Sequence, residues 1–179
     1  MNLPNKITLA RIVFIPVYCA LMSRQDSLFS AIAGAIFIAL SLTDLLDGHI
    51  ARKRGMVTDL GKFMDPVADK LLVLAAISLF VARSRISVYA LILIFARELA
   101  VLSLRAIAAN KQQVIAADSL GKLKTITQMV SISAMHFELL LPWVWLEYAN
   151  NAVFYISLAL TAISGGNYIY QNLSAFSES

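Results

Sequence analysis

Five aspartates lie within the 26 residues DLLDGHIARKRGMVTDLGKFMDPVAD, a segment that begins at Asp44 and ends at Asp69. Long apolar runs flank this segment on both sides. An ionised aspartate near the centre of a bilayer costs about 2.5–3.5 kcal/mol, and converging carboxylates also repel one another. The segment therefore predicts a site at which bound cations compensate clustered carboxylates.

Successive residues of a helix are rotated by about 100°, and this rotation places four of the five aspartates on two helix faces. The first face holds Asp44, Asp47, Gly48, Ala51 and Arg52, and the second holds Gly61, Asp65 and Asp69. Helices joined by a short loop are antiparallel neighbours, so we expect the two acidic faces to meet. The fifth aspartate, Asp59, is interpreted as a loop or cap residue.

Clustered carboxylate oxygens favour hard divalent cations such as Mg²⁺, Mn²⁺ or Ca²⁺. Two such ions would balance four carboxylates, and pairs of close ions serve phosphoryl chemistry. Gly48, Ala51 and Gly61 leave space beside the carboxylates, although small residues alone are also typical of ordinary helix packing. Arg52 adds a permanent cation that suits a phosphate. The segment thus indicates a metal site for a phosphate-bearing substrate.

Membrane-spanning helices are the elements that must position these residues. The 179 residues are 59% hydrophobic and 15% charged, with a mean hydropathy of +0.74, whereas soluble domains carry about a quarter charged residues. A spanning helix needs about 20 mostly apolar residues. Six windows qualify, at 7–23, 27–51, 60–82, 86–109, 121–141 and 150–170.

Only helices and closed β-barrels can span a bilayer, and the sequence has no segments with the alternating pattern of a barrel. The sequence therefore predicts an all-α fold. We expect a single membrane domain over 1–179, with an interfacial segment at 1–6 and a polar tail at 171–179.

The distribution of Lys and Arg predicts the orientation. One side carries nine: Lys6, Arg11, Arg52, Lys53, Arg54, Lys62, Lys111, Lys122 and Lys124. The other side carries only Arg24, Arg83 and Arg85. By the positive-inside rule, we expect a multi-pass protein with both termini in the cytoplasm. Membrane lipids are its expected surroundings, and no nucleic-acid partner is expected.

The aspartate segment resembles the signature of the CDP-alcohol phosphotransferases, D-x2-D-G-x2-A-R-x8-G-x3-D-x3-D. All fixed positions are present at the right spacing, from Asp44 to Asp69. The resemblance implies six transmembrane helices, commonly in a homodimer, with a polar cavity open to the cytoplasm. It also implies two divalent cations, Mg²⁺ or Mn²⁺, that hold the diphosphate of a CDP-linked lipid.

The resemblance assigns roles to the motif residues. The implied metal ligands are Asp44, Asp47, Asp65 and Asp69, and Asp69 is also the implied general base for the acceptor hydroxyl. The implied contacts to the CDP-lipid are Gly48, Ala51, Arg52 and Gly61, with Thr58 as a helper. The implied reaction transfers a substituted phosphate to an alcohol and releases CMP.

Three further segments resemble the bacterial phosphatidylglycerophosphate synthase branch of this family: NLPNKITLARI, ARELAVLSLR and GKLKTITQMV. This branch implies CDP-diacylglycerol as donor, sn-glycerol 3-phosphate as acceptor and the cytoplasmic membrane of a bacterium as location. Inositol phosphate, serine and phosphatidylglycerol are the alternative acceptors. A divalent-cation transporter is a less favoured alternative, because the outer halves IAGAIFIAL and ISLFVA of the second and third spans are apolar.

An anionic acceptor requires a cationic clamp, and Arg within a span is functional by default. Arg97 and Arg105 lie eight residues apart, about 12 Å along a helix. Together with Lys122 and Lys124 they are the predicted acceptor-phosphate site. The alternatives are an internal pair of Arg97 with a carboxylate such as Glu98, and positive-inside anchoring by the lysines.

Polar residues in the first and fifth windows are left with two interpretations each. Asn5 and Thr8, spaced three apart with Arg11, either reach the cytidine or cap the first helix. His136 lies deep in the fifth window, where a packing histidine is favoured over a metal ligand.

Overall fold

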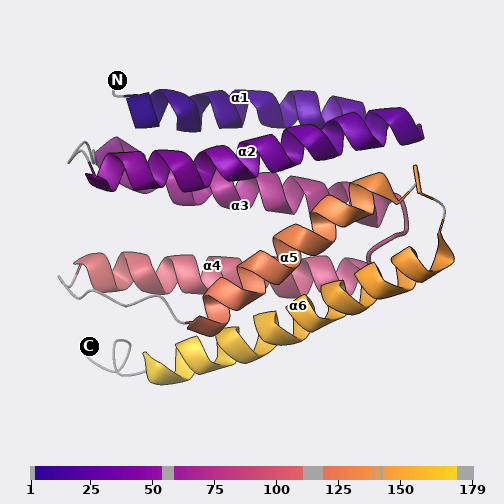
Figure 1. The fold of residues 1–179 in the computed structure, drawn as a ribbon. Coiled ribbons are helices and arrows are strands. Elements are labelled where there is room, and N and C mark those ends of the chain that lie inside the picture. The colour runs from indigo at the N-terminus through magenta and orange to yellow at the C-terminus, as the bar shows by residue number, and fades with distance from the viewer. Residues whose placement is uncertain (1–2, 54–58, 111–118, 139, 142, 173–179) are drawn as a thin grey trace. The chain divides into compact units, whose positions relative to one another are not determined.

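Six helices make up the part of the chain that the structure, a computed structural model, describes. This part leaves out residues 1–2, 54–58, 111–118, 139, 142 and 173–179, and the side chains of 3–4, 44–53, 59–60, 62–63 and 109–110. The helices are α1 (Leu3–Ser23), α2 (Ser27–Lys53), α3 (Asp59–Ala82), α4 (Val88–Asn110), α5 (Ser119–Phe137) and α6 (Val144–Gln171) (Figure 1). Outside the left-out residues there is no strand, so the all-α prediction is confirmed.

Each predicted window corresponds to one helix, but the ends differ. Helix α1 begins at Leu3 rather than at residue 7, so it includes residues 3–6 of the predicted interfacial segment. The other large differences lie between α5 and α6. The fifth window ran to residue 141, but α5 ends at Phe137, whose carbonyl accepts hydrogen bonds from the N–H groups of Leu140 (3.0 Å) and Leu141 (3.2 Å). Proline at 142 in the sequence disfavours helix in the residue before it. Helix α6 begins at Val144 rather than 150, because a helix tolerates polar residues at its start that a hydropathy window rejects.

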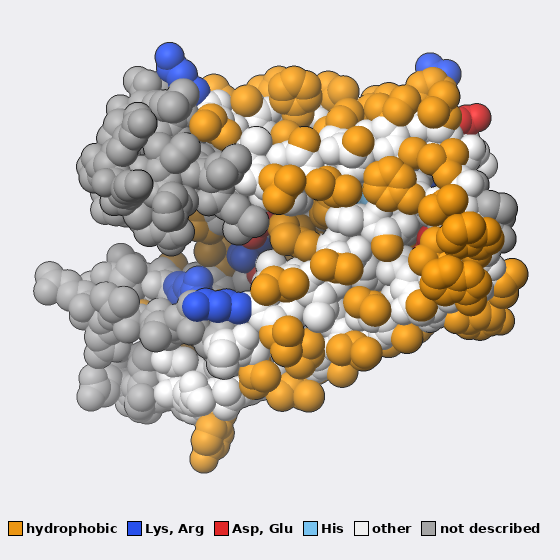
Figure 2. All heavy atoms as spheres, viewed as in Figure 1, with side chains coloured by type: hydrophobic (Ala, Val, Ile, Leu, Met, Phe, Trp, Pro, Cys, Tyr) orange, Lys and Arg blue, Asp and Glu red, His pale blue; other side chains and the backbone are white. Residues whose placement is uncertain are grey.

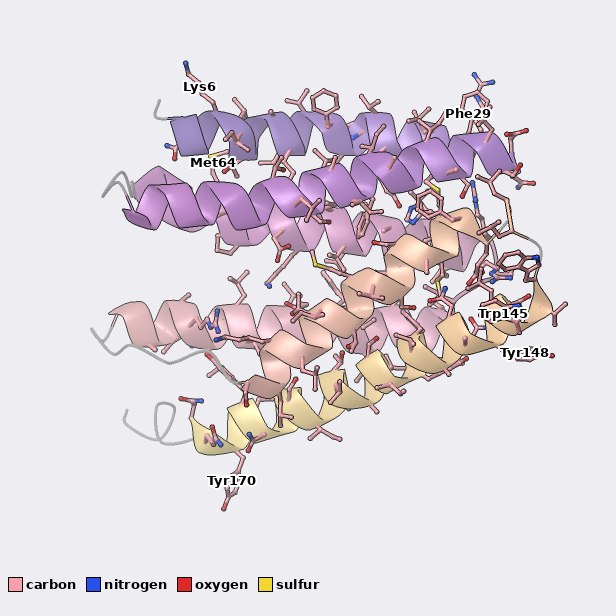
Figure 3. The ribbon with its side chains drawn as sticks, viewed as in Figure 1. Lys6, Phe29, Met64, Trp145, Tyr148 and Tyr170 are labelled. Carbon is pink, nitrogen blue, oxygen red and sulfur yellow. The ribbon has the colours of Figure 1, made fainter. Side chains whose placement is uncertain are left out.

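The apolar helix surfaces are consistent with a membrane protein. Among the described residues, Asn5–Ser23 and Val144–Gln171 are both long and apolar enough to cross a bilayer. Hydrophobic side chains also cover much of the visible surface of the helices (Figure 2), as lipid-facing side chains do. Trp145 and Tyr148 are exposed at the start of α6 (Figure 3), a position typical of an interfacial aromatic belt.

The chain divides into two compact units. Unit 1 comprises residues 1–85 and 133–143, and unit 2 comprises 86–132 and 144–179. Because α5 contributes residues to both, the division does not follow a boundary along the chain. The single-domain interpretation therefore stays a prediction.

In unit 1, α1 packs against both α2 and α3. Arg83, at the end of α3, secures the end of α1: its Nη2 donates to the carbonyls of Met22 (2.5 Å) and Arg24 (2.8 Å). Arg85 forms an ion pair with Glu138. Arg83 thus satisfies backbone carbonyls at the end of α1, which would otherwise be without hydrogen bonds.

His136 is a packing residue, as the sequence favoured. Its side chain is fully buried, and its Nε2 shares a hydrogen bond of 2.9 Å with the Tyr18 hydroxyl. Phe37 stacks on the imidazole at 5.5 Å between ring centroids, and Phe80 meets it edge-on at 4.9 Å. The ring fits against α2 only because residue 34 is glycine: a Cβ there would lie 2.5 Å from the His136 Cβ.

In unit 2, α4 packs against α6. The buried residues of α6 recur every three or four positions: Asn150, Phe154, Ser157, Thr161, Ser164, Gly165 and Tyr168. This spacing places them on one face, and most of them are small or polar. At Gly165 a Cβ would lie 2.8 Å from Cγ of Arg97, so the glycine makes room for the arginine stem.

We predict that Gly34→Ala destabilises the protein by about 1–3 kcal/mol, because the added methyl overpacks the contact with His136. Gly166→Ala is the matched control, since open space surrounds that position. Thermal unfolding in detergent measures both variants. Equal midpoints for the two would contradict the tight contact.

Candidate active site

The aspartate segment spans the junction of α2 and α3. The end of α2 and the start of α3 lie at the same end of unit 1 (Figure 1), as the antiparallel arrangement requires. In α2 the structure describes only the backbone of the motif residues, and their side chains lie outside the described part of the chain. These residues are Asp44, Asp47, Gly48, Ala51 and Arg52. Thr58 lies outside it altogether.

The second acidic face is described in full. Gly61 is buried, and Asp65 and Asp69 are half-buried. All three lie within α3, where the spacing of four residues places them on one face. Pro66 lies inside the helix rather than in its first turn. The predicted face on α3 is therefore present.

A residue of α1 contacts this face directly. The hydroxyl of Thr8, which is fully buried, donates a hydrogen bond of 2.6 Å to Oδ1 of Asp65. Asn5 and Arg11, three residues to either side of Thr8, are also buried. Thr8 and Arg11 lie inside α1 rather than at its cap, so the capping interpretation is wrong for them. A nucleotide contact by Asn5 or Thr8 stays a prediction.

The carboxylates of Asp65 and Asp69 have the donor chemistry that Mg²⁺ or Mn²⁺ prefers. Thr8 engages one oxygen of Asp65, in the manner of groups that orient a metal ligand. Within the described residues there is no group of three or more His, Cys, Asp or Glu that could hold a metal ion. Because Asp44 and Asp47 are outside that search, the site for two ions stays a prediction.

Two of the four predicted acceptor cations share one carboxylate in unit 2. Glu98 Oε1 accepts hydrogen bonds from Arg97 Nη1 (3.1 Å) and Lys124 Nζ (2.5 Å). Arg97 Nη2 also donates to Ser164 on α6, at 3.2 Å. The internal pair with Glu98, the alternative for Arg97, is therefore present, and it ties α4 to α5 and α6. Among the contacts described here, two cations share this one carboxylate.

The other two cations are arranged differently. Arg105 is exposed, and its Nε donates to the Tyr168 hydroxyl at 3.2 Å. Lys122 is exposed at the start of α5. Neither faces a carboxylate among the residues that the structure describes.

Sequence reasoning did not single out Ser164 or Tyr168. Both belong to the buried face of α6, and their spacing with Thr161 was the available signal. The partner of Thr8 was also missed, because nothing in the sequence relates residue 8 to residue 65.

Comparisons with known proteins agree with the motif. Residues 1–163 match the family model described as CDP-alcohol phosphatidyltransferase. A CDP-diacylglycerol--glycerol-3-phosphate 3-phosphatidyltransferase of Bacillus subtilis strain 168 is 40% identical, over 99% of this chain and 98% of the relative. The enzyme of that name in Rickettsia typhi is 36% identical, over 93% of this chain and 94% of its own. A probable phosphatidylglycerophosphate synthase of Mycobacterium tuberculosis strain H37Rv is 37% identical, over 96% of this chain and 82% of its own.

The family model covers most of the chain and includes the whole aspartate segment. The relatives align over nearly its entire length. This chain belongs to the CDP-alcohol phosphatidyltransferase family.

Proposed function

We propose that this protein transfers the phosphatidyl group of CDP-diacylglycerol to sn-glycerol 3-phosphate, giving phosphatidylglycerophosphate and CMP in phospholipid biosynthesis. The observation that carries the proposal is the similarity over 99% of the chain to a relative whose name states this donor and this acceptor. The complete aspartate motif and the cationic residues of unit 2 support it.

In the proposed reaction, a hydroxyl oxygen of glycerol 3-phosphate attacks the phosphorus that bears the diacylglycerol. The bond from that phosphorus to the bridging oxygen breaks, and CMP leaves with the electron pair. Asp69 takes the hydroxyl proton, which fits a carboxylate that acts as the oxygen begins to bond. Such transfers depend on positioning and charge neutralisation more than on covalent chemistry by the protein.

The residues proposed to hold two divalent cations, Mg²⁺ or Mn²⁺, are Asp44, Asp47, Asp65 and Asp69. When bound, such ions neutralise the diphosphate and the developing charge. The proposed contacts to the CDP-lipid are Asn5, Thr8, Gly48, Ala51, Arg52, Thr58 and Gly61. Glycerol 3-phosphate is assigned to the cations of unit 2, with Arg105 and Lys122 as direct contacts and Arg97 and Lys124 as added positive charge.

The finer features of the membrane arrangement belong to the same proposal. All six helices span the cytoplasmic membrane of a bacterium, both termini are cytoplasmic, and a polar cavity opens to the cytoplasm. The excess of Lys and Arg on that side supports this orientation. A homodimer is proposed from the family resemblance.

We predict that the purified protein in detergent releases CMP from CDP-diacylglycerol when glycerol 3-phosphate and Mg²⁺ or Mn²⁺ are present. Chelation of the metal by EDTA stops the release, and renewed Mg²⁺ restores it. Chromatography of the nucleotide measures CMP. Parallel reactions with inositol phosphate, serine and phosphatidylglycerol test the acceptor: faster turnover with any of these would replace glycerol 3-phosphate.

Asp69→Asn is predicted to abolish turnover while part of the nucleotide binding survives, because the amide cannot take up the acceptor proton. Single-turnover CMP release measures the reaction, and CDP binding by calorimetry measures the nucleotide site. Full activity of this variant would exclude Asp69 as the base.

Thr8→Val is predicted to weaken Mn²⁺ binding about tenfold, because Asp65 loses the hydrogen bond that fixes its orientation. Calorimetric titration with Mn²⁺ measures the affinity independently of turnover. Thr127→Val is the matched control, since the Thr127 hydroxyl bonds only backbone carbonyls of its own helix. An unchanged Mn²⁺ affinity in Thr8→Val would show that the bond to Asp65 does not serve a metal site.

A further inference from the structure

The described contacts of Arg105 involve only one edge of its guanidinium group. Nε donates to the Tyr168 hydroxyl at 3.2 Å, and Cζ lies 5.8 Å from the centroid of the Tyr168 ring. Among the described residues, nothing accepts a hydrogen bond from the terminal nitrogens Nη1 and Nη2. These two nitrogens carry four of the five N–H groups of the side chain and form a fork that matches two phosphate oxygens.

Tyr168 is itself held firmly. Only 3% of it is exposed, and it forms a buried cluster with Val101 and Leu104 of α4. This packing fixes the position of the Tyr168 ring and of its hydroxyl group. Because Tyr168 comes from α6 and Arg105 from α4, the hydrogen bond fixes the guanidinium group relative to the packed pair of helices.

An arginine in a membrane-spanning helix requires an anion or water, because lipid cannot solvate its charge. The Tyr168 hydroxyl is neutral, so it orients the guanidinium group without cancelling its charge. Glu98, in contrast, accepts hydrogen bonds from both Arg97 and Lys124. Of the two arginines, Arg105 is thus the one whose charge no carboxylate compensates within the described part of the chain.

We infer that Tyr168 is a positioning residue for the acceptor: it holds Arg105 so that Nη1 and Nη2 face the phosphate monoester of the alcohol substrate. This inference rests on the proposed function. It adds a residue outside the aspartate motif that determines affinity for a phosphorylated acceptor and has no part in the reaction at the donor phosphorus.

The test compares two Tyr→Phe variants of the same helix. Tyr168→Phe removes the hydroxyl and keeps the ring in its buried cluster. Tyr170→Phe is the matched control, because Tyr170 is 77% exposed and points away from α6 (Figure 3). CMP release is measured with purified protein in detergent, with one substrate varied while the other is saturating.

Tyr168→Phe is expected to raise the KM for glycerol 3-phosphate about fivefold, with kcat and the KM for CDP-diacylglycerol unchanged. Tyr170→Phe leaves all three values unchanged. Arg105→Ala raises the acceptor KM by about tenfold or more, and Tyr168→Phe adds nothing in that background, because its effect acts through the arginine.

Other outcomes overturn the inference. An unchanged acceptor KM in Tyr168→Phe, with turnover by the unaltered protein, would exclude the positioning role and leave the proposed function standing. A rise only in the KM for CDP-diacylglycerol would place the Arg105 fork on the lipid phosphates instead. Equal effects of Tyr168→Phe with and without Arg105 would show that the hydroxyl acts independently of it. Absence of CMP release with glycerol 3-phosphate from the unaltered protein would overturn the proposed acceptor and this inference together.

Discussion

The cost of placing charge among apolar helices is the constraint on which the rest of this structure depends. Several polar groups in the interior have specific partners: Thr8 donates to Asp65, and Glu98 accepts from Arg97 and Lys124. An unpaired charge at these places would cost several kcal/mol, whereas a hydrogen-bonded one is tolerated. The same bonds fix the orientation of side chains to which the proposed function assigns roles, so stability and the proposed chemistry place the same demand on these positions.

The two units satisfy this constraint with opposite charges. Unit 1 carries the acidic face of α3, with Asp65 oriented from α1. Unit 2 carries a cationic cluster on α4 and α5, partly balanced by Glu98, and Arg105 oriented from α6. The proposed reaction accounts for this difference, because a donor held through divalent cations requires carboxylates and a phosphorylated acceptor requires cations. The small residues of α6, such as Gly165 beside Arg97, make the close approach of these long side chains possible.

The helices were predictable because hydropathy and length follow directly from the residues. Errors occurred at the start of α1, which begins at Leu3 rather than at residue 7, and between α5 and α6, where the apolar run through Leu141 continues beyond the helix end at Phe137. Hydropathy reports solvent preference, but helix ends depend on backbone geometry and proline. The interpretation of His136 as a packing residue was confirmed, since a histidine in an apolar run needs only one polar partner, here Tyr18.

The sequence by itself determined the family, the reaction class and the acidic motif, because the fixed spacing from Asp44 to Asp69 depends only on neighbours along the chain. Only the tertiary structure decided which of the described cations form ion pairs with a carboxylate. Arg97 and Arg105 are alike in sequence, both in an apolar helix, yet one shares Glu98 with Lys124 while the other rests on the neutral hydroxyl of Tyr168. Glu98 is adjacent to Arg97, but Lys124 and Tyr168 come from other helices. Their contacts arise from helix packing, which no local pattern of residues specifies.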